Sequence, residues 1–132
     1  MMETVSPEAE ISLGAWKVGE ESVRQYLKAV GDAHLEYFRA NLVPPLALAA
    51  YALGALLEKL ALPPGAIHSL QEVETLGPVK MGEEISGIAR LERPRRRGNW
   101  QFTTASYTLR KANGQQVQAG KSTVLIPMSS PP

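Results

Sequence analysis

The sequence predicts an α+β domain in which an antiparallel sheet wraps around one central, apolar helix. Residues 46–60 form a helix that is apolar on nearly every face until Glu58 and Lys59, and such a helix must be covered on most sides by other structure. Everything after it is typical of β-strands, and Asn113-Gly114 is a two-residue hairpin signal that makes its flanking strands antiparallel. One apolar helix followed by a long meander is best satisfied by a sheet that curls around the helix.

The first third of the chain predicts a strand, a helix and a connector. A short strand is expected over residues 11–18. In residues 20–30 the apolar positions Val23, Tyr26, Leu27 and Val30 recur at helical spacing. Gly31 is suited to a left-handed C-terminal cap, so this helix should end just before Asp32.

The remaining elements follow in order. Residues 32–42 form a connector with one helical turn, and the apolar helix begins near Pro45 or Leu46, because proline is tolerated in the first turn. Pro63-Pro64-Gly65 ends that helix. Strands are expected over 67–76, 84–93, 99–111 and 115–126. The sheet would keep an exposed edge, which favours burial by dimerisation.

Composition limits the class of protein. The 132 residues suit a single domain over 1–132, with loose ends at about 1–10 and 128–132. The formal net charge of +1 gives no general attraction to nucleic acid. The absence of cysteine and the spacing of the two histidines predict no metal site. No signal peptide is apparent, and the apolar run 42–57 is too short to span a membrane, so a cytoplasmic location is expected.

Several segments resemble the MaoC-like hot-dog proteins. WKVGEESVRQYLKAVGD is similar to the family's first strand and helix, which end in "GD". The helix behind VPPLA, followed by AIHSLQEVETLGPVKMGEEI, is similar to its core helix and next strands. The resemblance covers roughly residues 14–127, and the order and spacing of the motifs are more specific than any one of them.

The resemblance implies a hot-dog fold, a homodimer or a heterodimer with a paralogous hot-dog subunit, and acyl thioesters of coenzyme A or acyl carrier protein as substrates. The usual reaction in fatty acid metabolism is reversible hydration of a 2-enoyl thioester to a 3-hydroxyacyl thioester. No cofactor is implied beyond the carrier of the substrate. An Asp and a His act as base and acid around one water, and a backbone amide at the start of the core helix polarises the thioester carbonyl.

Residue by residue, the resemblance places Asp32 on the catalytic aspartate. The catalytic histidine of active members comes five positions later, where this chain has Tyr37, whereas His34 lies two positions after Asp32. The amide donor of the family comes from the glycine of a His-Gly pair, and Pro44-Pro45 stands there. Proline has no N–H, so Leu46 or a neighbour would have to supply the donor. The connector is also shorter than in active hydratases, and "GD…Y…PP" is closer to the non-catalytic halves of double hot-dog dehydratases.

Each candidate also has a purely structural interpretation. Asp32 could be a turn residue and His34 an exposed loop residue. Tyr37 could donate its hydroxyl to a thioester oxygen or pack beneath the connector. His68, a possible substrate contact, is equally typical of a hydrogen-bonded, half-buried strand residue.

The arginine-rich segment, Arg95, Arg96 and Arg97, could bind the phosphates of coenzyme A or an acidic carrier protein, or could be a solvated hairpin tip.

Two functions are therefore expected. The first is a (R)-3-hydroxyacyl-thioester dehydratase or 2-enoyl-thioester hydratase with impaired or partner-dependent catalysis, in which Asp32 and His34 are catalytic. In that case Tyr37, Pro45 and Leu46 would contact the substrate. The second is a non-catalytic hot-dog subunit or acyl-coenzyme A-binding module that pairs with a catalytic paralogue.

Overall fold

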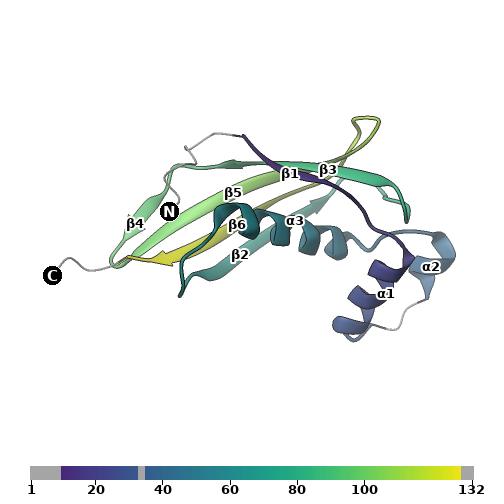
Figure 1. Ribbon diagram of the computed structural model, residues 1–132, viewed down its shortest axis with the longest axis horizontal. Coiled ribbons are helices and arrows are strands. Elements are labelled where there is room, and N and C mark those ends of the chain that lie inside the picture. The colour runs from purple at the N-terminus through teal and green to yellow at the C-terminus, as the bar shows by residue number, and fades with distance from the viewer. Residues whose placement is uncertain (1–9, 33–34, 129–132) are drawn as a thin grey trace.

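The computed structural model describes residues 10–32 and 35–128, and it shows an antiparallel sheet curved along a central helix (Figure 1). The elements, in chain order, are β1 (Glu10–Lys17), α1 (Glu20–Ala29), α2 (Glu36–Ala40), α3 (Pro45–Leu60), β2 (Ile67–Thr75), β3 (Glu84–Leu91), β4 (Arg95–Arg97), β5 (Trp100–Lys111) and β6 (Gln116–Pro127). The predicted fold class is confirmed. No helix in the described parts of the chain is long and apolar enough to cross a membrane.

The sheet has six strands, and its main path runs β1-β3-β5-β6-β2, with β4 paired to β5. Every pairing is antiparallel. β1 and β2 are therefore the two edges, although they flank α3 in the sequence. Figure 1 shows α3 lying along the concave face, with α1 and α2 gathered near its first turn.

α3 begins with Pro45 in its first turn, as predicted. The side chains that it buries are Ala47, Leu48, Ala49, Ala52, Leu56 and Leu60. The expectation that the helix would be covered on most sides is wrong for the isolated chain. Leu46 is 61% exposed and Tyr51 is 41% exposed, because the sheet covers α3 from one side only.

Two turn regions differ from the sequence prediction. The hairpin at Asn113-Gly114 is a three-residue loop, in which Gly114 donates to the Lys111 carbonyl at 2.9 Å. Gly114 has φ +88°, and a glycine in this left-handed position is typical of a turn followed by a bulge. The arginine-rich segment is the short strand β4 rather than a loop, because its backbone pairs with Trp100–Phe102 of β5.

One buried hydrogen-bond chain joins the sheet to the start of α3. The Gln118 side chain on β6 is 0% exposed. Its Nε2 donates to the carbonyl oxygen of Pro45 at 2.8 Å, and its Oε1 accepts from the Tyr107 hydroxyl at 2.9 Å. Burial raises the pKa of Tyr107, which keeps this hydroxyl protonated as a donor. Since a buried amide must be paired, Gln118 fixes the first turn of α3 against the sheet.

Candidate functional site

Asp32 lies directly after the C-terminal cap of α1. Gly31 has φ +72°, the left-handed conformation that the sequence predicted for it. The Asp32 N–H donates to the Leu27 carbonyl oxygen at 2.9 Å, which closes the last turn of the helix. The Asp32 side chain is half-buried, so its carboxylate sits at the rim of the connector.

Two tyrosines, one on each helix that flanks Asp32, pack against the core. Tyr37, on α2, is half-buried and packs against the core, and Tyr26 on α1 does the same. Burial raises the pKa of Tyr26, and the nearby acidic groups of Tyr37 and Asp32 raise it further. Tyr26 therefore interacts electrostatically with both Tyr37 and Asp32.

The start of α3 has a single candidate amide donor within its first two residues. Pro45 has no N–H, and the amides of Ala47 and Leu48 both donate to the Pro44 carbonyl oxygen, at 2.9 and 3.3 Å. Within the described residues, no hydrogen bond takes the N–H of Leu46. Free N–H groups at a helix start attract partial negative charge, so this amide is suited to bind an oxygen atom.

A pocket of about 370 Å³ lies beside this helix start. Its lining comes from α2, α3 and the segment between β2 and β3: Tyr37, Leu42, Val43, Pro45, Leu48, Thr75, Leu76, Gly77, Pro78 and Val79. The connector is fixed to the β2–β3 segment by hydrogen bonds from the Val43 N–H to the Val79 oxygen at 2.8 Å and from the Met81 N–H to the Asn41 oxygen at 3.0 Å. Tyr37 and Pro45, both predicted to contact the substrate, thus line one mostly apolar pocket.

Of the two predicted histidines, the structure describes only His68. His34 lies outside the described residues. His68 is exposed on β2 rather than half-buried, at an irregularity in its pairing with β6. β2 begins soon after α3 ends, and 16 helical residues place the two ends of α3 about 24 Å apart. His68 is thus at the opposite end of α3 from Pro45.

The arginines Arg95, Arg96 and Arg97 are all exposed on β4. Figure 1 shows β4 at one end of the molecule and α1 and α2 at the other. Within one chain, these arginines therefore lie at the opposite end of the molecule from α1 and α2.

Sequence reasoning missed the contribution of residues 75–79 to the pocket. The only available signal was Gly77-Pro78, which interrupts the strand pattern after Thr75. That signal shows where the strand ends, but not that the segment closes against the connector.

The architecture is a hot-dog fold, and it is similar to the folds of a solved hot-dog-like protein, a MaoC-like dehydratase and an (R)-hydratase. No protein-family profile and no curated sequence matches the chain. Its similarity to solved structures nevertheless extends over nearly the whole chain.

Three solved structures illustrate this similarity. A monoamine oxidase regulatory protein from Archaeoglobus fulgidus is 16% identical, with a TM-score of 0.81, and the match covers 98% of this chain and 95% of that one. An (R)-hydratase from A. caviae involved in PHA biosynthesis is 18% identical, with a TM-score of 0.79 and coverage of 95% and 99%. The HadBC (3R)-hydroxyacyl-ACP dehydratase complex from Mycobacterium tuberculosis is 16% identical, with a TM-score of 0.68 and coverage of 91% and 98%. At these identities the comparison shows the shared fold.

Proposed function

We propose that this chain binds acyl thioesters of coenzyme A or acyl carrier protein, as a hydratase or dehydratase of the (R)-3-hydroxyacyl type whose catalysis depends on a partner chain. The observation that carries this proposal is the pair Tyr37 and Pro45 in one pocket. Tyr37 stands where the resemblance expects the catalytic histidine, and Pro45 where it expects an amide donor. Relative to the active members of the family, the chain retains the aspartate, as Asp32, and the core helix. It has Tyr37 in place of the catalytic histidine and Pro45 in place of the amide donor.

The remaining groups suggest how a thioester would be held. Its carbonyl oxygen would accept from the Leu46 N–H, and its acyl chain would enter the apolar pocket. Asp32, assisted by His34, would take a proton from water as the water oxygen bonds to C3 of the enoyl group. A proton then returns to C2, which completes the 3-hydroxyacyl product. Without a histidine at position 37, this proton transfer lacks the acid–base partner that contributes about 10²–10⁴ in rate.

The alternative is a non-catalytic subunit that supplies an acyl-binding pocket to a catalytic paralogue. The solved HadBC dehydratase and the solved ChsH1-ChsH2 complex, both similar to this chain in fold, are complexes of two different subunits. Exposed apolar side chains along α3 and β2 provide a surface for such pairing: Leu46 at 61%, Ile67 at 49% and Leu76 at 41% exposure. β2 is also a sheet edge, where a second chain can add strand hydrogen bonds.

The decisive measurement is hydration of crotonyl-coenzyme A by the purified chain, alone and mixed with any hot-dog protein encoded beside it. We expect little turnover alone and a clear gain in the mixture. Asp32→Asn should reduce that gain if Asp32 is catalytic, and should leave it unchanged if the chain is a non-catalytic subunit. Strong activity of the chain alone that disappears in Asp32→Asn would contradict partner dependence. Absence of both turnover and acyl-coenzyme A binding would contradict both functions.

A second prediction concerns β4. If Arg95, Arg96 and Arg97 meet the phosphates of the carrier, they do so for a site completed by a partner chain. Replacing all three by Ala should then weaken coenzyme A binding by the assembled protein and flatten its salt dependence. Removing exposed positive charges elsewhere, at Lys17 and Lys59, is the control and should have little effect. Equal affinity in the arginine variant and in the control would leave β4 as a solvated edge strand.

A further inference from the structure

We propose that the chain has a second small-molecule site, between α3, β1 and α1, for a compact aromatic amine. The site is a pocket of about 600 Å³ on the side of α3 that faces β1. This volume is within the usual range for small-molecule sites. Its ligand class follows from three features: the aromatic lining, a buried indole N–H without a partner among the described residues, and a carboxylate with no basic residue among the other lining residues.

Small residues on two facing elements leave the space open. Ala50, Gly54 and Ala55 of α3 line the pocket together with Gly14 and Ala15 of β1. A Cβ added at Gly54 or at Gly14 would meet nothing within 4 Å. The volume is thus not filled by neighbouring side chains of the described residues.

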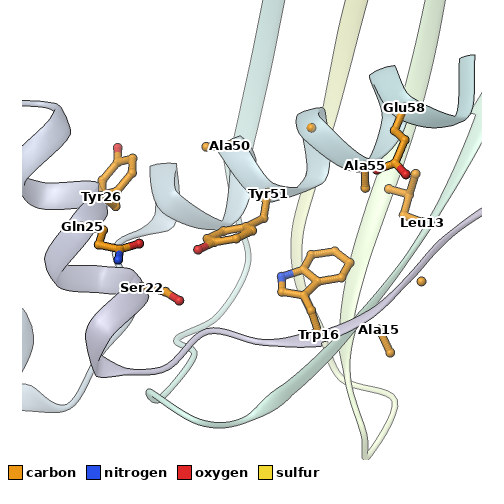
Figure 2. A pocket seen from close by; sticks show the side chains of 12 residues that line it. Leu13, Ala15, Trp16, Ser22, Gln25, Tyr26, Ala50, Tyr51, Ala55 and Glu58 are labelled. Carbon is orange, nitrogen blue, oxygen red and sulfur yellow. The ribbon is translucent and has the colours of Figure 1, made fainter. Parts of the chain in front are cut away.

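Aromatic rings border this space. Figure 2 shows Trp16 and Tyr51 in the middle of the pocket and Tyr26 at its α1 end. Such rings bind a flat apolar group, and their faces also attract a cation. An aromatic ring that carries an ammonium group satisfies both preferences.

The Trp16 indole N–H is the unusual group. The Nε1 atom is buried and has no hydrogen-bond partner within residues 10–32 and 35–128. Buried polar groups are paired in the great majority of cases, and Figure 2 shows this nitrogen on the side of the indole toward Tyr51. The nitrogen itself is closed to solvent, so a ligand hydroxyl would complete this donor once the exposed Tyr51 side chain moves aside.

The charge of the pocket favours a cation. Glu58 of α3 projects into one end, and Ser22 and Gln25 of α1 provide neutral polar groups at the other. No lysine or arginine occurs among the described residues of the lining. An anionic ligand would therefore meet a carboxylate with no compensating charge, whereas an amine would be paired with Glu58.

The pocket is separate from the candidate thioester site. The two pockets share no lining residue among those described. β1 and β2 are opposite edges of the sheet, so a chain that pairs through β2 leaves this pocket open. The proposal therefore does not depend on the proposed function.

The test uses four probes that share a phenyl ring: 2-phenylethylamine, 2-phenylethanol, 3-phenylpropionate and an amino alcohol, 2-amino-1-phenylethanol. The chain has two tryptophans, Trp16 and Trp100, so its ¹⁵N-correlated spectrum contains two indole N–H signals, which Trp16→Phe assigns. We expect the amine to shift the Trp16 signal saturably and to leave the Trp100 signal in place. The amine should bind tighter than the alcohol, and the carboxylate weakest. An aryl amino alcohol should bind tighter than the plain amine, because its hydroxyl can accept from Trp16.

Glu58→Gln supplies the charge test, since Glu58 is exposed and its replacement leaves the core intact. It should weaken amine binding about fivefold, as an exposed ion pair allows, without changing alcohol binding. Trp16→Phe keeps a ring but loses the N–H, and calorimetry should show that it removes the advantage of the amino alcohol. Preference for the carboxylate over the amine, equal amine binding in Glu58→Gln, or no shift of the Trp16 signal with any probe would each overturn the proposal.

Discussion

Replacing Tyr37 by His and Pro45 by Ala in one chain should raise its rate of crotonyl-coenzyme A hydration by about 10² or more. The first change restores an imidazole five positions after Asp32, in a pocket that already holds the tyrosine ring. The second restores a backbone N–H at the first position of α3 without weakening the helix, because Ala is a good helix former. Spectrophotometric assays of crotonyl-coenzyme A hydration by the variant and by the parent chain measure the ratio of the two rates.

The control for this gain is the neighbouring proline. Pro44 is the N-terminal cap residue of α3, so Pro44→Ala also restores an N–H, but one residue outside the helix. Tyr37→His combined with Pro44→Ala should therefore gain much less than the combination with Pro45→Ala. If both combinations fold and neither exceeds the parent rate, Tyr37 and Pro45 are not what limits catalysis, and the non-catalytic function gains support.

Gly120→Ala should cost about 3 kcal/mol of unfolding free energy, the upper end of the usual range for overpacking. A Cβ at Gly120 would overlap Cε2 of Tyr107 and would lie 2.6 Å from the backbone oxygen of Glu72. The first contact could be relieved by moving a ring, but that ring is buried and its hydroxyl is bonded to Gln118. The second is with backbone of the paired strand β2, which would have to move. Urea unfolding monitored by circular dichroism measures the loss.

The same substitution elsewhere in the chain provides the control. Gly54 lies within α3, and a Cβ there would meet nothing within 4 Å. Gly54→Ala should therefore stabilise the protein, by about 0.5–1 kcal/mol, because alanine loses less backbone entropy in a helix. A similar, small effect of both substitutions would mean that β2 and the Tyr107 ring adjust freely around Gly120.

Most of the fold could be predicted because each element is determined by local pattern. Helical spacing from Val23 to Val30 and the apolar run from residue 46 fixed the type of both longer helices, and alternation fixed the strands. The sequence prediction is wrong where hydrogen bonding between distant backbone segments determines the structure. β4 is a strand because β5 pairs with it, although its own side chains are three arginines. Likewise, Asn113-Gly114 marks the turn, but the position of the bulge depends on the strand register.

The candidate site was predictable only in part. The resemblance, through residue spacing along the chain, identified Asp32, Tyr37 and Pro45 as the positions that correspond to the family's functional groups. It did not identify the wall from Thr75 to Val79, because hydrogen bonds between distant backbone segments bring that wall to the pocket. The pocket beside Trp16 was missed entirely, since small residues such as Gly54 and Ala50 show no sign in sequence of facing an empty space.

Gln118 has a consequence for how relatives diverge. A glutamine on an inward-facing strand position is a poor choice for an apolar core, and random drift would replace it by an aliphatic residue unless its amide is needed. Its two partners are a tyrosine hydroxyl on β5 and a carbonyl in the first turn of α3. Because the two side chains are hydrogen-bonded partners, a change at Tyr107 in an orthologue should be accompanied by a change at Gln118.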